Sequence, residues 1–230
     1  MTITYERGAA RLAELGLSVD IVATALRRAD ADSAACSELD PPILEGLLRW
    51  GRTTKYLREG LLPSGWTFDN PRNLARTISP ARDVAIVVAT GNDRTGLADY
   101  EAGTRHHKGY ATERAISTNG QLTFDLGELV QVSGSDRAAG GDPPDLWLLL
   151  FLADEDNFRA ELSLPAAIDK GRITEWSERI LLPVIPRYPD RGGNAPGYCA
   201  VGPATAGPNV EWHGPPNLSA DPAICSTVGP

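Results

Sequence analysis

The sequence predicts an α+β protein with a small helical N-terminal part, a mostly antiparallel β-sheet built from hairpins, and an extended C-terminal tail. In residues 1–62, apolar side chains recur at helical spacing. Residues 63–186 instead hold β-branched and alternating runs that turn signals separate. Residues 187–230 include 15 prolines and glycines and have no periodic apolar pattern. These three ranges are the expected divisions of the chain.

The N-terminal part is expected to contain three helices. A short amphipathic run covers residues 5–15. Ser18 can cap the second helix, because a serine oxygen at this position accepts from a free backbone N–H. The third helix is expected to begin at Asp40, which precedes a proline, and to end near residues 60–63. Gly51 predicts a kink or break within it, since glycine destabilises a helix interior by about 1 kcal/mol.

The first strands of the sheet are predicted from composition and from turn residues. Residues 83–90 form a β-branched run that suits a buried strand. Residues 112–117 and 121–124 flank Asn119 and the glycine that follows it. An Asn-Gly pair between two such runs is a strong hairpin signal, so a hairpin is expected here.

A second hairpin is expected from residues 146–152 and 158–164, which enclose an acidic turn. In the latter run, apolar residues alternate with Arg159, Glu161 and Ser163, which predicts a half-exposed strand. Residues 173–182 fit a helix or a strand, and flanking prolines favour the strand.

The tail is expected to pack over the β core or over a protein partner. Its composition buries too little apolar surface to form a separate domain. Three apolar residues punctuate it and are the candidate docking residues: Tyr198, Trp212 and Leu218.

Composition and charge exclude several classes of protein. The chain is 42% hydrophobic and 23% charged, which is typical of a folded protein. The longest apolar run, residues 146–153, is far shorter than the roughly 20 residues of a membrane-spanning helix, so no membrane association is expected. The start of the chain has no secretory pattern, and the three cysteines form no CxxC pair. We therefore expect a cytoplasmic protein.

The net charge of −8 is unevenly distributed. Residues 71–115 contain seven basic and five acidic side chains, whereas residues 116–230 contain seven basic and fifteen acidic ones. The acidic surface disfavours nucleic-acid binding by the whole molecule. A local basic patch in the first half stays possible as a contact for nucleic acid.

The segment around residues 105–108 is the first candidate site. It places Arg105, His106, His107 and Lys108 in a row between glycines. Arginine and lysine neutralise phosphate, and a histidine can act as a general acid or base. The simpler reading is a solvated turn. Adjacent histidines point in different directions, so they do not predict a metal site.

Two further segments could contact phosphate. Arg49, Arg52, Lys55 and Arg58 recur every three residues and cover one broad helix face, which can contact nucleic acid or simply be solvated. Residues 91–96 form a glycine-bounded turn after a strand. The Lys-Ser/Thr that completes a P-loop is missing from this turn, so nucleotide binding is a minor alternative.

The acidic residues of 154–156, together with Glu161, could in principle hold Mg²⁺ or Ca²⁺. The lysine of a nuclease motif is missing after Glu161, and the acidic residues fall at an expected hairpin tip. No metal and no cofactor are therefore predicted.

The leading hypothesis is a non-enzymatic binding or assembly protein that docks on a protein partner through its helical part or its tail. One alternative is an accessory protein that contacts nucleic acid through the basic first half. Another is an enzyme for a phosphate-bearing substrate, with a histidine acid or base. The composition is typical of a high-GC bacterium. Residues 70–73, 77–80 and 88–91 resemble segments of uncharacterised proteins encoded on bacterial mobile elements, a resemblance that implies no activity.

Overall fold

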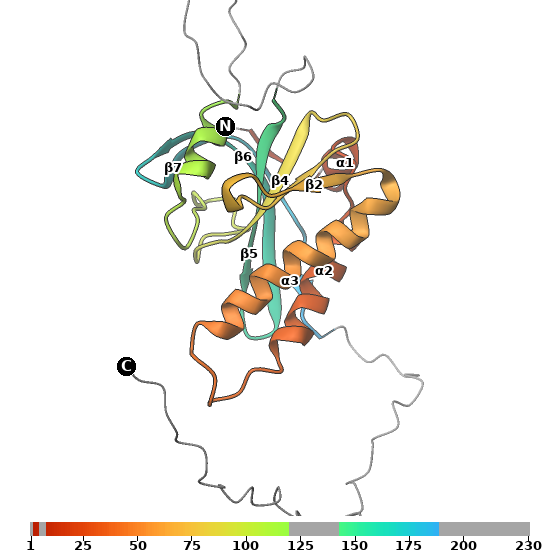
Figure 1. Ribbon diagram of the computed structural model, residues 1–230, viewed down its shortest axis with the longest axis vertical. Coiled ribbons are helices and arrows are strands. Elements are labelled where there is room, and N and C mark those ends of the chain that lie inside the picture. The colour runs from red at the N-terminus through yellow and green to blue at the C-terminus, as the bar shows by residue number, and fades with distance from the viewer. Residues whose placement is uncertain (1, 5–7, 120–142, 189–230) are drawn as a thin grey trace, which may run out of the picture. The chain divides into compact units, whose positions relative to one another are not determined.

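The computed structural model describes residues 2–4, 8–119 and 143–188 (Figure 1). In this part of the chain, eight strands form one sheet in the order β1-β7-β6-β5-β4-β3-β2, and β8 pairs with β6. The elements are β1 (Thr2–Thr4), α1 (Gly8–Glu14), α2 (Val19–Ser33), α3 (Leu44–Leu61), the 3-10 turn η1 (Leu62–Ser64), β2 (Thr67–Asp69), η2 (Pro71–Asn73), β3 (Arg76–Ile78), β4 (Val84–Thr90), α4 (Tyr110–Ile116), β5 (Asp145–Ala153), β6 (Asn157–Asp169), β7 (Arg172–Leu181) and β8 (Ile185–Pro186).

The pairing confirms the expected α+β class. Most neighbouring strands are antiparallel, and only the β1–β7 and β4–β5 pairs are parallel among the described strands. The expected hairpin of residues 146–152 and 158–164 is present as β5 and β6. Residues 173–182 lie almost entirely in β7, so the strand reading is correct.

The N-terminal helices form a hairpin of α2 and α3 (Figure 1). Ser18 caps α2 as expected, since its hydroxyl accepts from the N–H of Ile21 at 3.2 Å. The expected start of α3 at Asp40 is wrong. The Asp40 carboxylate instead accepts from the N–H and hydroxyl of Ser37, and α3 begins at Leu44 without a side-chain cap. The helix continues through Gly51 without the expected break.

The sheet is buried on both faces. Helices α1, α2 and α3 pack on one face through an apolar cluster that includes Leu26, Leu57 and Phe151. On the other face, a second cluster joins Leu148 and Trp176 to α4 and to the segment between β4 and α4. This burial explains why β4 and β5 are almost continuously apolar.

The hairpin expected at Asn119 is wrong for the first of its two predicted strands. Residues 112–117 lie in and directly after α4, with Thr112 and Ile116 buried one turn apart. The amide of Asn119 pairs with the backbone N–H and C=O of Leu146. Because β4 and β5 are parallel, the chain needs a long crossover between them, and α4 lies in it. The second run, residues 121–124, lies outside the described residues.

The half-exposed pattern expected for β6 is also wrong. Glu161 and Ser163 are fully buried although they alternate with the apolar residues of the strand. The segment after β4 covers them, because its Gly96 N–H donates to the Glu161 carboxylate. The tail residues Tyr198, Trp212 and Leu218 lie outside the described residues.

Candidate functional site

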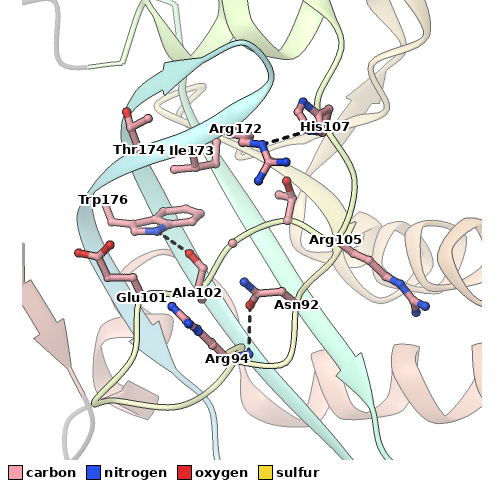
Figure 2. A pocket seen from close by; sticks show the side chains of 12 residues that line it. Asn92, Arg94, Glu101, Ala102, Arg105, His107, Arg172, Ile173, Thr174 and Trp176 are labelled. Atoms are coloured by element: carbon pink, nitrogen blue, oxygen red, sulfur yellow. Dashed lines mark hydrogen bonds between the residues drawn. The ribbon is translucent and has the colours of Figure 1, made fainter.

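A polar hollow of about 240 Å³ lies between the segment after β4 and the first half of β7 (Figure 2). We call it the arginine pocket. It joins two segments that the sequence analysis selected separately, residues 91–96 and 105–108, and adds residues of β7. Its lining residues are Asn92, Arg94, Glu101, Ala102, Gly103, Thr104, Arg105, His107, Arg172, Ile173, Thr174 and Trp176.

The chain itself shapes the pocket by turning back beside β4. After Gly91 it turns, and Thr104 then forms a β-bridge with Gly91. The Asn92 N–H donates to the carbonyl of Gly103, and the Arg105 N–H donates to the carbonyl of Thr90, each at 2.9 Å. These backbone bonds bring the 91–96 turn to residues 101–107.

A buried ion pair fixes this segment to the sheet. Glu161 of β6 and Arg179 of β7 are both 0% exposed, and two nitrogens of the guanidinium donate to the two carboxylate oxygens at 3.1 and 2.6 Å. The same guanidinium donates to the carbonyls of Leu97 and Tyr100. The Glu161 carboxylate also accepts hydrogen bonds from the Ser163 hydroxyl and from the Gly96 N–H. This pairing makes Glu161 a structural anchor of the segment after β4.

Trp176 forms one wall of the pocket. Its ring is buried, and its indole N–H donates to the carbonyl of Ala102 at 2.9 Å. Figure 2 shows the ring facing the hollow between Ile173 and the 101–103 segment. The sequence signal for this role was weak, because Trp176 comes from a run that also fits a helix.

His107 contacts both sides of the β6–β7 turn. Lys170 and Gly171 form this two-residue turn, both with positive φ, as type I′ hairpins require. The His107 Nδ1 lies 2.8 Å from the carbonyl of Lys170, and its Nε2 lies 3.1 Å from the Nε of Arg172. A carbonyl only accepts and a guanidinium only donates, so Nδ1 carries the proton and Nε2 accepts. The ring is therefore held as its neutral Nδ1–H tautomer.

The side chains around the hollow differ in direction. Figure 2 shows Arg172, Asn92 and Arg94 around it, with Arg94 beside Glu101, whereas the side chain of Arg105 extends away. Three arginines and one glutamate give the lining a formal charge of +2. This local charge has the opposite sign to that of the whole chain.

The remaining two residues of the 105–108 segment lie outside the pocket lining. His106 is exposed, and its ring has no hydrogen-bond partner among the described residues. Lys108 is half-buried beside Gly171, and burial lowers the pKa of its amine. The structure therefore brings Arg105 and His107 to one hollow and separates them from the other two.

The basic face expected on α3 carries cations that already have intramolecular partners. Arg49 pairs with Asp30 and Glu45, Arg52 with Asp32, and Lys55 with Glu59. Arg58 donates to the carbonyls of Asp69 and Arg76 and to Asn70, and burial lowers its pKa. Nucleic-acid contact through these residues stays a prediction, although the partners reduce the charge that is free for phosphate.

A second surface was missed by the sequence analysis. The N-terminal half of α3 and the connection before it expose large apolar side chains, which we call the α3 apolar surface. Its members and exposed fractions are Leu39 (97%), Ile43 (74%), Leu47 (52%) and Trp50 (36%). The apolar periodicity predicted the helix but not which of its apolar residues are exposed. Only the second half of α3, from Thr53 onward, is buried.

Comparison with known proteins adds no relative: the chain matches no protein-family model, no curated protein and no solved structure. Within residues 2–4, 8–119 and 143–188, no helix is long and apolar enough to cross a membrane. The same ranges contain no group of three or more histidine, cysteine or carboxylate side chains that could hold a metal ion.

Proposed function

We propose that this chain is a binding or assembly protein that docks on a protein partner through the α3 apolar surface. The observation that carries the proposal is the exposure of Ile43, Leu47 and Trp50 on a helix whose second half is buried. Single exposed apolar residues are common on protein surfaces, but contiguous ones mark interaction sites.

Helical spacing supports a continuous surface. Residues 43, 47 and 50 are separated by four and three positions, so they lie on one face of the helix. The Leu47 N–H donates to the carbonyl of Ile43, which extends the helical turn to that residue. The Trp50 indole N–H donates to the carbonyl of Val88, which fixes the ring beside the edge of β4. A fixed aromatic side chain is typical of an interface anchor.

Charges around this surface indicate the chemistry of the partner. Glu38 is exposed beside it and Asp40 is half-buried, whereas Glu45 is exposed but pairs with Arg49. Arg49 is the nearest cation along the helix and is paired with carboxylates. The expected partner is therefore a protein with an apolar groove that basic side chains surround.

The arrangement of His107 favours binding over acid–base catalysis. Both ring nitrogens are engaged, one by a carbonyl and one by Arg172. A general base needs a nitrogen within reach of the substrate proton. The enzyme alternative would have to break one of these contacts.

The test uses the tagged full-length chain as bait in a lysate of the organism that encodes it, with and without nuclease. The bait variants are wild type, Ile43→Glu/Leu47→Glu, and the control Leu62→Glu, which changes an exposed apolar residue past the end of α3. Burial of one such side chain stabilises a complex by about 1.5–3 kcal/mol, so the double variant should lose its partner.

The expected result is a protein that mass spectrometry finds with wild type and with Leu62→Glu but not with the double variant. Equal capture by all three baits would refute the role of this surface. Capture that disappears with nuclease would point to nucleic acid instead. If light scattering shows a wild-type dimer that the double variant abolishes, the occupant is a second copy, and the proposed partner chemistry is wrong.

A further inference from the structure

The arginine pocket is a second feature that the proposed docking role leaves unused. It lies on the face of the sheet opposite α3, since Trp176 belongs to the α4-side cluster. It is concave, and three separate segments converge on it. In small-ligand sites, a few convergent polar groups fix the orientation of the ligand.

Arg172 carries an uncompensated charge at this pocket. Arg172 is exposed and forms no ion pair within the described residues, whereas the half-buried Arg49 and the buried Arg179 are paired with carboxylates. The Nε of Arg172 instead donates to an uncharged imidazole. Both terminal amino groups of Arg172 have no hydrogen-bond partner within the described residues. A guanidinium that offers two parallel N–H groups binds phosphate oxygens in a bidentate manner.

His107 holds this guanidinium in place without neutralising it. Its Nδ1–H is fixed by the carbonyl of Lys170, which leaves Nε2 directed at Arg172. A carboxylate in the same place would orient the arginine equally well but would compete with an incoming anion. The imidazole therefore acts as a positioning group.

Asn92 supplies a further free donor. Its Oδ1 accepts from the N–H of Arg94, so its amide nitrogen faces away from that bond. A Cβ built on Gly103 would lie only 3.2 Å from this nitrogen. The nitrogen has no hydrogen-bond partner among the residues that the structure describes. Gly103 thus leaves the amide unobstructed.

The lining charge favours an anion. Arg94 and Arg172 outweigh Glu101 around the hollow, and Arg105 adds a further positive charge nearby although its side chain extends away. A phosphomonoester carries about −1.5 to −2 at pH 7. A carboxylate carries half of that and offers two oxygens instead of three. The volume of about 240 Å³ also accommodates a small ligand.

We propose that the arginine pocket binds a small phosphomonoester, with its phosphate group between Arg172 and Asn92. Arg172 contacts the phosphate in a bidentate manner, the Asn92 amide donates to it, and Arg94 adds charge. His107 is the positioning residue for Arg172. No bond is formed or broken, and the site is independent of the docking surface on α3.

The test is isothermal titration calorimetry of the full-length chain with glycerol 2-phosphate, inorganic phosphate and acetate. Saturable binding of glycerol 2-phosphate, weaker binding of inorganic phosphate and no binding of acetate are expected. Arg172→Gln should weaken binding at least about tenfold, because it removes charge-assisted hydrogen bonds. Arg52→Gln is the matched control: it removes the same charge on α3 and should bind as wild type does.

The positioning role of His107 has a separate readout. His107→Ala should weaken binding severalfold, whereas His107→Gln should restore part of the affinity, because the glutamine oxygen can accept from Arg172 in place of Nε2. Thermal unfolding of each variant checks that the fold is intact.

The proposal is overturned if glycerol 2-phosphate gives no saturable heat, or if Arg172→Gln binds as tightly as wild type. Equal losses in Arg172→Gln and Arg52→Gln would show unspecific attraction and would also overturn it. If a short single-stranded oligonucleotide binds through Arg172 while monoesters do not, the phosphate comes from nucleic acid, and the small-ligand proposal is wrong.

Discussion

Removal of the buried Glu161 carboxylate should destabilise the protein more than any surface change. In Glu161→Leu, the fully buried guanidinium of Arg179 loses its counter-charge. Breaking a buried pair in this way costs about 3–5 kcal/mol. Ser163 and Gly96 also lose their acceptor, which costs about 1 kcal/mol for each bond. The expected loss lies at the upper end of that range, near 5 kcal/mol.

The double variant Glu161→Leu/Arg179→Met separates the pair from its surroundings. With both charges replaced by apolar groups, no uncompensated charge remains, so the double variant should be more stable than Glu161→Leu alone. The carbonyls of Leu97 and Tyr100 still lose their donor. The segment that lines the arginine pocket should therefore loosen while the sheet stays folded.

Urea unfolding followed by tryptophan fluorescence measures both effects. A loss of 5 kcal/mol is comparable to the total stability of a small protein, about 5–15 kcal/mol, so the single variant should unfold at low urea or fail to fold. A coupling energy of at least 2 kcal/mol is expected from the double-mutant cycle. If the two single losses simply add, within about 0.5 kcal/mol, the pair does not act as a unit and the reasoning fails.

Three other changes have defined outcomes. Gly171→Ala places a Cβ 2.6 Å from a backbone oxygen at a residue with φ of 76°, so chemical unfolding should show a loss of about 1–3 kcal/mol in the free energy of unfolding. In the control Gly46→Ala, the added Cβ meets nothing within 4 Å, so the free energy of unfolding should rise by about 1 kcal/mol. Equal effects of the two substitutions would contradict this reasoning. Asn119→Ala removes three hydrogen bonds to the backbone of β5 and β6 and should cost about 1–3 kcal/mol in the same assay, and an unchanged midpoint would count against the contact. Lys108→Met should raise the melting temperature near pH 7, because burial lowers the pKa of this amine and the charged form is penalised below that folded pKa. Wild-type stability should rise with pH between the folded pKa of Lys108 and its ordinary value near 10.5, so the stability advantage of Lys108→Met should shrink over this pH range. An advantage that is independent of pH would exclude desolvation of the amine as its cause.

Local signals in the sequence predicted the elements whose stability is local. Ser18 caps α2 through a bond to a residue three positions later, and the β-branched run of β4 is buried as expected. The prediction failed where a contact between residues far apart in the sequence determines the local structure. Asn119 pairs with Leu146, so the Asn-Gly signal for a hairpin was overridden by a contact 27 residues away.

The site was predicted only in part for the same reason. Arg105 and His107 were selected from their own segment, but Arg172 lies 65 residues after His107 and reaches it only through the register of the β6–β7 hairpin. Glu161 was weighed as a metal ligand because no local pattern reveals its pair with Arg179. The alternation of apolar and polar residues along β6 indicated that its polar face is exposed to solvent. The segment after β4 covers this face and buries it.

The position of β1 has a consequence for the order of events during synthesis. β1 pairs in parallel with β7, and Ile3 lies opposite Arg179. A ribosome adds about 5–20 residues per second, so roughly 9 to 35 seconds separate the two strands. Until then, β1 has no neighbouring strand, because β7 is the strand with which it pairs. The earliest part of this chain to emerge is thus among the last to reach its native contacts, which gives chaperones a defined interval in which to act.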